Sequence, residues 1–82
     1  MLHRIFAVHD GAAGAFLQPF ILPSRETATR ALADCVLDKN HNFGKWPASY
    51  TLYELATWDE LTGRIEPLDV PDNLGPLSQF VS

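Results

Sequence analysis

The segment from Lys39 to Tyr50 is the part of the sequence whose residue types and spacing could do chemistry. Basic and aromatic side chains alternate along it, at Lys39, Phe43, Lys45, Trp46 and Tyr50. Proteins that bind single strands combine cations along the nucleic-acid backbone with rings that stack on bases, at about 1–3 kcal/mol per base. The segment therefore forms a candidate nucleic-acid-binding site, with Arg25 and Arg30 of a preceding helix as further phosphate contacts.

The same segment also has a structural interpretation. Loops of this length in small domains often place one or two aromatic side chains in the core. Trp46 and Pro47 are suited to anchoring the chain just before a strand that begins at Tyr50. Two lysines are also few compared with the usual number of phosphate contacts. The residues alone favour the structural role and leave nucleic-acid contact as the alternative.

Residues arranged for catalysis or metal binding are not evident. His9 and Asp10 are adjacent in a predicted strand, so their side chains point to opposite faces. Gly11 and Gly14 fit a turn better than a phosphate-binding loop. The three histidines and the one cysteine lack the spacing of metal ligands. We therefore predict a protein that is not an enzyme, with no catalytic residue, no metal and no cofactor.

Charge is distributed unevenly along the 82 residues. The formal net charge is −4, which disfavours delocalised binding to phosphates. Residues 54–82 carry one base, Arg64, against six acids: Glu54, Asp59, Glu60, Glu66, Asp69 and Asp72. We predict that these acids form a solvated hairpin and tail. The alternative is a surface that repels nucleic acid or docks a basic partner.

The cysteine count and the N-terminal residues bear on location and assembly. A single cysteine excludes an intrachain disulfide and indicates a reducing compartment. The sequence shows neither a signal-peptide pattern nor an apolar run of membrane-spanning length, so we expect a cytoplasmic protein that does not enter a membrane. A chain this short builds a thin core, and self-association would add stability. A monomer and a homodimer both stay open.

The first half of the chain predicts a hairpin followed by a helix. Residues 4–9 and 16–22 are rich in strand formers, and Pro19 places the second strand at a sheet edge or at a bulge. Ser24 is a good N-cap for a helix that ends within residues 38–40. The apolar stripe of this helix consists of Ala28, Ala31, Leu32, Cys35 and Val36.

The second half predicts another hairpin and a tail. Residues 50–58 form the clearest strand, and residues 59–63 turn the chain, with Gly63 at a position that accepts a positive φ. A short returning strand over residues 64–66 ends at Pro67. The Pro-rich tail, residues 67–82, is expected to be irregular and to pack on the core at several of its apolar residues, which are Leu68, Val70, Leu74, Leu77, Phe80 and Val81.

These elements predict one domain over residues 1–82. Its fold class is α+β, of ββαββ order, with a mainly antiparallel sheet and one helix packed on one face. Only the tail or a partner is then left to cover the other face of the sheet.

Several short motifs, in this order and at these spacings, resemble a known family. They are IFAVHD at residues 5–10, FLQPF at 16–20, FGKWP at 43–47, YTLYEL at 50–55 and DELTGRI at 59–65. Together they resemble the small nonstructural protein of gokushoviruses, which are single-stranded DNA phages of the Microviridae, and the resemblance covers almost the whole chain. It implies a viral protein of the host cytoplasm that is absent from the virion. It also implies DNA binding and a part in DNA replication, at the switch to single-stranded genome synthesis or packaging.

The leading hypothesis is thus a non-enzymatic phage accessory protein that contacts single-stranded DNA. The alternative is a dimeric protein–protein interaction module that docks a phage or host replication or assembly protein. The acidic hairpin and the edge strand with Pro19 motivate this alternative.

Overall fold

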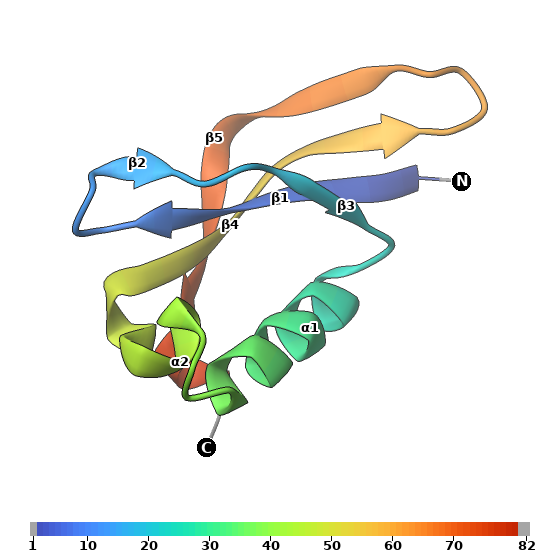
Figure 1. Ribbon diagram of the computed structural model, residues 1–82. Helices are drawn as coiled ribbons and strands as arrows, with labels where there is room; N and C mark the ends of the chain where they lie inside the picture. The colour runs from blue at the N-terminus through green and yellow to red at the C-terminus, as the bar shows by residue number, and fades with distance from the viewer. Residues whose placement is uncertain (1, 81–82) are drawn as a thin grey trace.

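In the computed structural model, which describes residues 2–80, helices cover one face of an antiparallel sheet (Figure 1). The strands are β1 (Leu2–Asp10), β2 (Ala15–Phe16), β3 (Phe20–Leu22), β4 (Tyr50–Asp59) and β5 (Ile65–Pro76). The helices are α1 (Arg25–Leu37) and α2 (Asn42–Lys45), with 3₁₀ turns at Pro47–Ser49 and Leu77–Gln79. The sheet order is β2-β1-β4-β5, and β3 also pairs with β1. The predicted fold class, α+β with one main helix on one face, is confirmed.

The first hairpin has its second strand at the sheet edge, as the sequence predicted. Pro19 lies between β2 and β3, which pair with two different parts of β1. Proline cannot donate a ladder hydrogen bond, so the edge strand is interrupted there. The Leu17 N–H still donates to the Val8 carbonyl at 2.8 Å, which keeps the connecting residues against β1.

Helix α1 begins after the predicted N-cap Ser24 and ends at Leu37, one residue before the predicted range. The Ser24 Oγ accepts a hydrogen bond from the Thr27 N–H at 3.2 Å, and Asp38 caps the other end. Three residues of the predicted stripe are buried against the sheet: Ala28, Leu32 and Val36. Ala31 is exposed and Cys35 is partly exposed, so the stripe that packs is narrower than the sequence indicated.

The prediction that the chain is irregular after Pro67 is wrong, because β5 continues to Pro76. Residues 65–67 pair with residues 56–58, and pairing with β4 resumes at Asp72 opposite Glu54. β5 is the outermost strand, where a proline can face away from the ladder or lie at an irregularity. Pro67 and Pro71 therefore accompany the unpaired stretch between residues 67 and 72 without ending the strand, which continues to Pro76.

A bulge in β4 decides which residues face the helix. The pairing shifts from Ile5 opposite Ala56 to Phe6 opposite Glu54, so Leu55 is an extra residue in β4. Such a bulge reverses the side-chain alternation on one side of it. Glu54 is two residues from the buried Leu52, before the bulge, and shares its helix-facing side. Beyond the bulge, Ala56 and Trp58 face away from α1 instead of continuing on that side.

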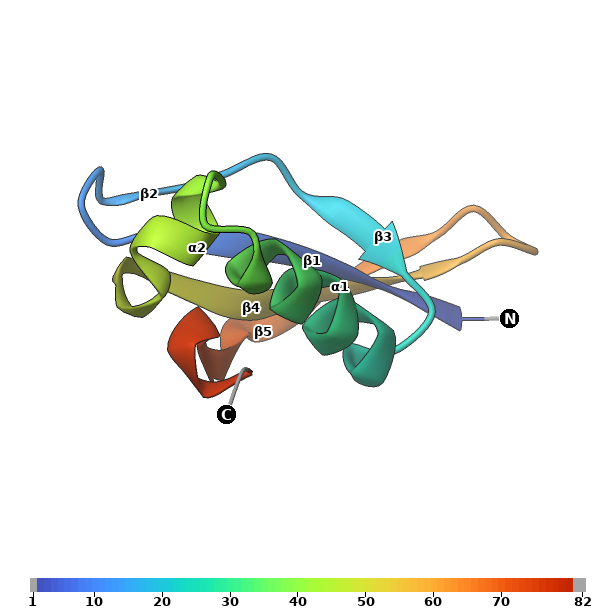
Figure 2. The same cartoon turned by 60° about the horizontal axis from the view of Figure 1, so that its bottom comes forward.

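The end of the chain packs on the same side of the sheet as the helices (Figure 2). Leu77 is fully buried, and Leu74 and Phe80 pack against the core, as the sequence predicted for the tail. Val70 does not pack there, because it is 73% exposed on β5. Val81 lies outside the described residues. Within residues 2–80, no element covers the opposite face of the sheet.

Candidate nucleic-acid interface

The segment 39–50 is not an open loop but two short helical turns, α2 and the 3₁₀ turn at residues 47–49. The His41 Nδ1 accepts a hydrogen bond from the Phe43 N–H at 3.0 Å and so caps α2. The Asp38 Oδ1 accepts from the Asn40 N–H at 2.9 Å in the preceding turn. These short-range hydrogen bonds fix the backbone that carries the candidate residues.

Gly44 explains how α2 packs so closely on the end of α1. A Cβ at this position would lie 2.0 Å from the Asp38 carbonyl oxygen and 2.9 Å from the Val36 carbonyl oxygen. No side chain fits in that space, so only glycine allows the contact. Sequence reasoning missed this role, although the glycine inside the motif FGKWP was its visible signal.

Two of the three aromatic residues in the segment point into the protein. Tyr50 is buried, and the Phe43 ring packs on the core with its centroid 4.7 Å from that of Tyr50. The Phe43 ring also lies 4.7 Å from the ring of His41. These rings hold α2 and the start of β4 together, which is the structural role that the sequence favoured for the segment.

Trp46 has the opposite placement. Its side chain is 58% exposed, so Trp46 is not one of the aromatic side chains that the segment places in the core. The Lys45 Nζ lies 5.9 Å from the centroid of its ring, within the range of a cation–π contact. Lys39 and Lys45 are both exposed. Trp46 also lines a shallow cavity with Asp10 and Ser49. The exposed ring and the two lysines, which we call the α2 surface, are the candidate residues of segment 39–50 that remain accessible.

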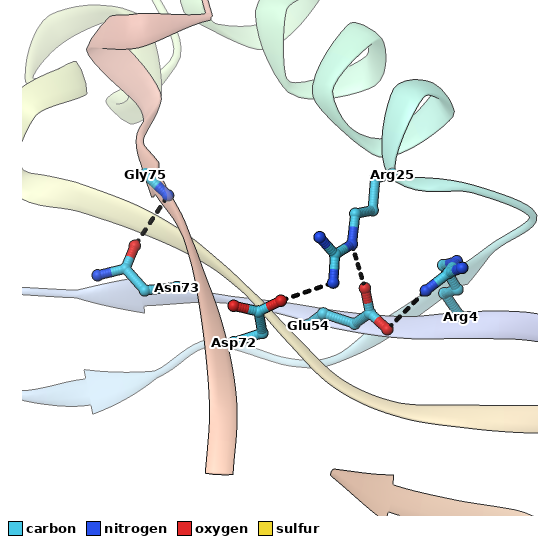
Figure 3. Close-up of polar contacts among 6 residues, drawn as sticks. All are labelled: Arg4, Arg25, Glu54, Asp72, Asn73 and Gly75. Atoms are coloured by element: carbon cyan, nitrogen blue, oxygen red, sulfur yellow. Dashed lines mark hydrogen bonds and ion pairs between the residues drawn. The ribbon is translucent and has the colours of Figure 1, made fainter.

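Arg25 is committed to carboxylates rather than free for phosphate (Figure 3). Its Nε donates to the Glu54 Oε1 at 2.7 Å and its Nη2 donates to the Asp72 Oδ2 at 2.6 Å. The hydrogen bond with Glu54, assisted by the charges of both carboxylates, raises the pKa of Arg25 against the opposing effect of burial. The Arg4 Nη1 donates to the Glu54 Oε2 at 2.9 Å. Two arginines and two carboxylates thus neutralise one another.

The prediction that all acidic residues of the hairpin and tail are solvated is wrong for Glu54. This residue is 1% exposed, and its two oxygens are bound by Arg4 and Arg25, so it ties β4 to β1 and α1. Asp72 extends the contact to β5. A buried carboxylate is tolerated because both oxygens are hydrogen-bonded to opposite charges. The sequence carried no signal of this arrangement, since its partners are far apart along the chain.

Arg30 is exposed on α1, but the structure does not bring it to the α2 surface. It lines a separate shallow cavity with Glu26, Thr29, Ala33 and Phe80. Of the seven predicted residues, three are exposed within segment 39–50, namely Lys39, Lys45 and Trp46, and Lys45 contacts Trp46. Whether any of the seven contacts DNA stays a prediction.

Residues 2–80 contain no group of three or more potential ligands that could hold a metal ion. In the same part of the chain, no helix has the length and apolar character that crossing a membrane requires. The thiol of Cys35 is free and partly exposed.

Comparison with known proteins places the chain in a family. No curated protein and no solved structure matches it. A family model described as "Phage ORF5 protein" matches residues 3–80, which is nearly the whole chain. The matched region includes the α2 surface, the Glu54 ion pairs and every strand except the first residue of β1. The chain therefore belongs to the Phage ORF5 protein family.

Proposed function

We propose that this phage protein is a non-enzymatic accessory protein of a single-stranded DNA phage, of gokushovirus type within the Microviridae. It acts in the host cytoplasm, outside the virion, when replication switches to single-stranded genome synthesis or packaging. Its contact with DNA is through the α2 surface. Family membership and the motif pattern support the phage setting.

The observation that carries the DNA contact is the exposed Trp46 ring with Lys45 beside it. An exposed ring on a fixed backbone can stack on a base without first leaving the core. Lys45 and Lys39 supply the charge that a neighbouring phosphate needs. Phe43 and Tyr50 contribute by holding the backbone beneath Trp46, since both pack on the core side.

The size of the effect follows from these few contacts. Two phosphate contacts predict a slope of about −1.4 for log affinity against log salt, or about a sevenfold loss between 50 and 200 mM salt. One stacked base is worth about 1–3 kcal/mol, so Trp46→Ala should weaken binding about 5- to 150-fold. Binding is therefore weak, salt-dependent and insensitive to base sequence.

The test is a fluorescence anisotropy titration with a labelled oligothymidine at about 50 mM salt, where phosphate contacts are strong. Lys45→Gln should weaken binding, whereas Arg64→Gln, the same charge change at the far end of the β4–β5 hairpin, should not (Figure 1). Trp58→Phe leaves Trp46 as the one tryptophan, so its emission reports stacking directly. Absence of binding, or equal losses in the two charge variants, would contradict the proposal.

The second candidate function is docking of a phage or host replication or assembly protein. The β4–β5 hairpin favours it, because this arm projects beyond the helices and combines acidic residues with exposed apolar ones (Figure 1). Leu61 at its turn is 83% exposed. In a capture experiment with purified phage replication and capsid proteins, Leu61→Asp should abolish docking and leave the DNA titration unchanged. Capture that is unaffected by this change would count against docking by the hairpin.

A further inference from the structure

The face of the sheet opposite α1 has a composition of its own. Directly paired residues of antiparallel strands point to the same face, and neighbours along a strand alternate. Val8 and Leu52 pair and are buried under α1, so Tyr53 and His9, one position along on each strand, point away from the helix. Phe16 pairs with His9 and shares that face.

The same reasoning extends the face along β1. Ile5 pairs with Ile21, and the two lie between pairs that face the core, so both point away from α1. His3 is two residues from Ile5 and pairs with Trp58, and their rings are 5.3 Å apart. We call six residues of this surface the open face: Ile5, His9, Phe16, Ile21, Tyr53 and Trp58.

The open face is aromatic and accessible. The ring of Phe16 lies edge-on to those of His9 and Tyr53, with centroids 4.9 Å and 5.3 Å away. Phe16 is 47% exposed and Ile21 is 50% exposed. Aromatic pairs of this geometry pack a core or an interface, and a contiguous apolar patch of this kind marks an interaction site.

None of the six residues that define the open face is a lysine, arginine, aspartate or glutamate. The ion pairs of Glu54 lie on the helix side and the lysines surround α2. At the hairpin end of the face, the Glu60 Oε2 lies 3.4 Å from the Nε2 of His3, the neighbour of Trp58. A nucleic acid needs cations at its contact surface, and this face offers none. Its chemistry instead fits an uncharged, apolar and aromatic partner.

Both edges of the sheet are closed to strand addition. Pro19 interrupts the β2–β3 edge, and Pro67, Pro71 and Pro76 interrupt the β5 edge. Prolines at edges prevent a second chain from continuing the ladder. A partner of the sheet must therefore pack on its face.

We infer that the open face is the interface of a homodimer in which two copies pack their sheets face to face. The face complements itself, because an uncharged aromatic surface presents the same chemistry to a copy, as a two-fold interface requires. Elsewhere, two chains of net charge −4 repel each other, and the open face lets them approach without opposing like charges.

The molecule is large enough to bury a standard dimer interface on its open face. The principal extents are 40 × 23 × 18 Å, so the broad side is large enough for the roughly 800 Å² per partner of a standard interface. Packed sheets lie about 10 Å apart, and aromatic side chains fill that distance. Dimerisation would also add the core that so short a chain lacks.

The dimer and the DNA contact are separate proposals. The α2 surface belongs to segment 39–50, and none of the six residues of the open face comes from that segment. A variant of one surface therefore leaves the other unchanged, and either proposal can fail alone.

The first test is sedimentation velocity over a range of protein concentrations. The wild-type chain of 9.1 kDa should sediment as a dimer at high concentration and dissociate on dilution. Phe16→Glu and Ile21→Glu should each raise the dissociation constant at least about 100-fold, because they desolvate an unpaired charge in the interface. Leu37→Glu is the matched control, since Leu37 is 61% exposed at the end of α1, and it should not change dimerisation.

Circular dichroism establishes that each variant is folded. If both glutamate variants unfold, amide chemical shifts of the wild type on dilution decide the question, and changes confined to β1, β2, β3 and β4 support the inference. A monomer at every concentration would overturn it, as would a dimer that both folded variants retain. Loss of oligothymidine binding in Phe16→Glu, with no dimer in the wild type, would overturn it in favour of nucleic acid on this face.

Discussion

Replacing Glu54 by glutamine is the sharpest test of how the sheet and the helix are joined. The change keeps the size of the side chain, so it creates no cavity, but it removes the charge that faces Arg4 and Arg25. The glutamine amide nitrogen would also point a donor at an arginine donor. Glu54 is 1% exposed, so water cannot easily replace the lost partners on the carboxylate side.

The expected loss follows from two hydrogen bonds, at 2.9 Å from Arg4 and 2.7 Å from Arg25. Hydrogen bonds to charged groups contribute about 1.5–3 kcal/mol each. The side chain of Arg4 is 42% exposed and that of Arg25 is 48% exposed. Water can therefore solvate both arginines in the variant, and the loss of stability lies toward the lower end of the range for two such bonds. The two bonds together contribute about 3–6 kcal/mol, so we expect the free energy of unfolding to fall by about 3 kcal/mol, which corresponds to roughly 12–24 °C in melting temperature for a domain of this size.

The assay is urea unfolding at pH 7, followed by circular dichroism and tryptophan emission. Asp72→Asn is the matched control, because it removes one carboxylate charge from the same cluster at a side chain that is 45% exposed. An exposed ion pair contributes less than about 1 kcal/mol, so this variant should remain close to the wild type. The reasoning fails if Glu54→Gln unfolds within about 0.5 kcal/mol of the wild type, or if Asp72→Asn is equally destabilising.

Three further outcomes are expected. Gly44→Ala should lower the free energy of unfolding by about 1–3 kcal/mol, because the added Cβ would collide with the Asp38 carbonyl. It should also weaken DNA binding, because α2 would shift. Thermal unfolding measures the first effect and the anisotropy titration the second. Ser24→Ala should cost about 1 kcal/mol through loss of the α1 cap, and a change below about 0.3 kcal/mol in urea would contradict that role. The pKa of Arg25 is raised in the folded protein, so its contribution is complete below its unfolded pKa and is lost only in strong alkali. The stability difference between wild type and Arg25→Gln should therefore be the same at pH 6 and pH 9, and a difference that changes across this range would refute the assignment.

Helices and turns whose signals lie in neighbouring residues were predictable from the sequence. The helix α1 needs only a cap at Ser24 and an apolar stripe over three turns, and both are contained in neighbouring residues. The hairpin turn at Gly63, with φ of +76°, is equally local. Local signals specify these elements because their hydrogen bonds join residues a few positions apart.

The candidate site was only partly predictable. The mixture of bases and rings in segment 39–50 was visible, but not which rings face solvent. That depends on α2 packing against Asp38 through Gly44, which turns Phe43 and Tyr50 inward and leaves Trp46 outside. The continuation of β5 beyond Pro67 was missed for a similar reason. A proline ends a central strand but not an edge strand, and the edge position is a property of the whole sheet.

The sequence by itself determined the fold class, the helix with its cap, the turns and the segment that carries the candidate chemistry. Only the tertiary structure decided which of those charges and rings are free. Arg25 is one example, because its partners Glu54 and Asp72 are 29 and 47 residues away along the chain. The open face is another, because it depends on strand order, on the bulge at Leu55 and on the tail packing with the helices. Composition shows how many charges and rings a chain has, but pairing and exposure are relations between distant residues, and folding sets them.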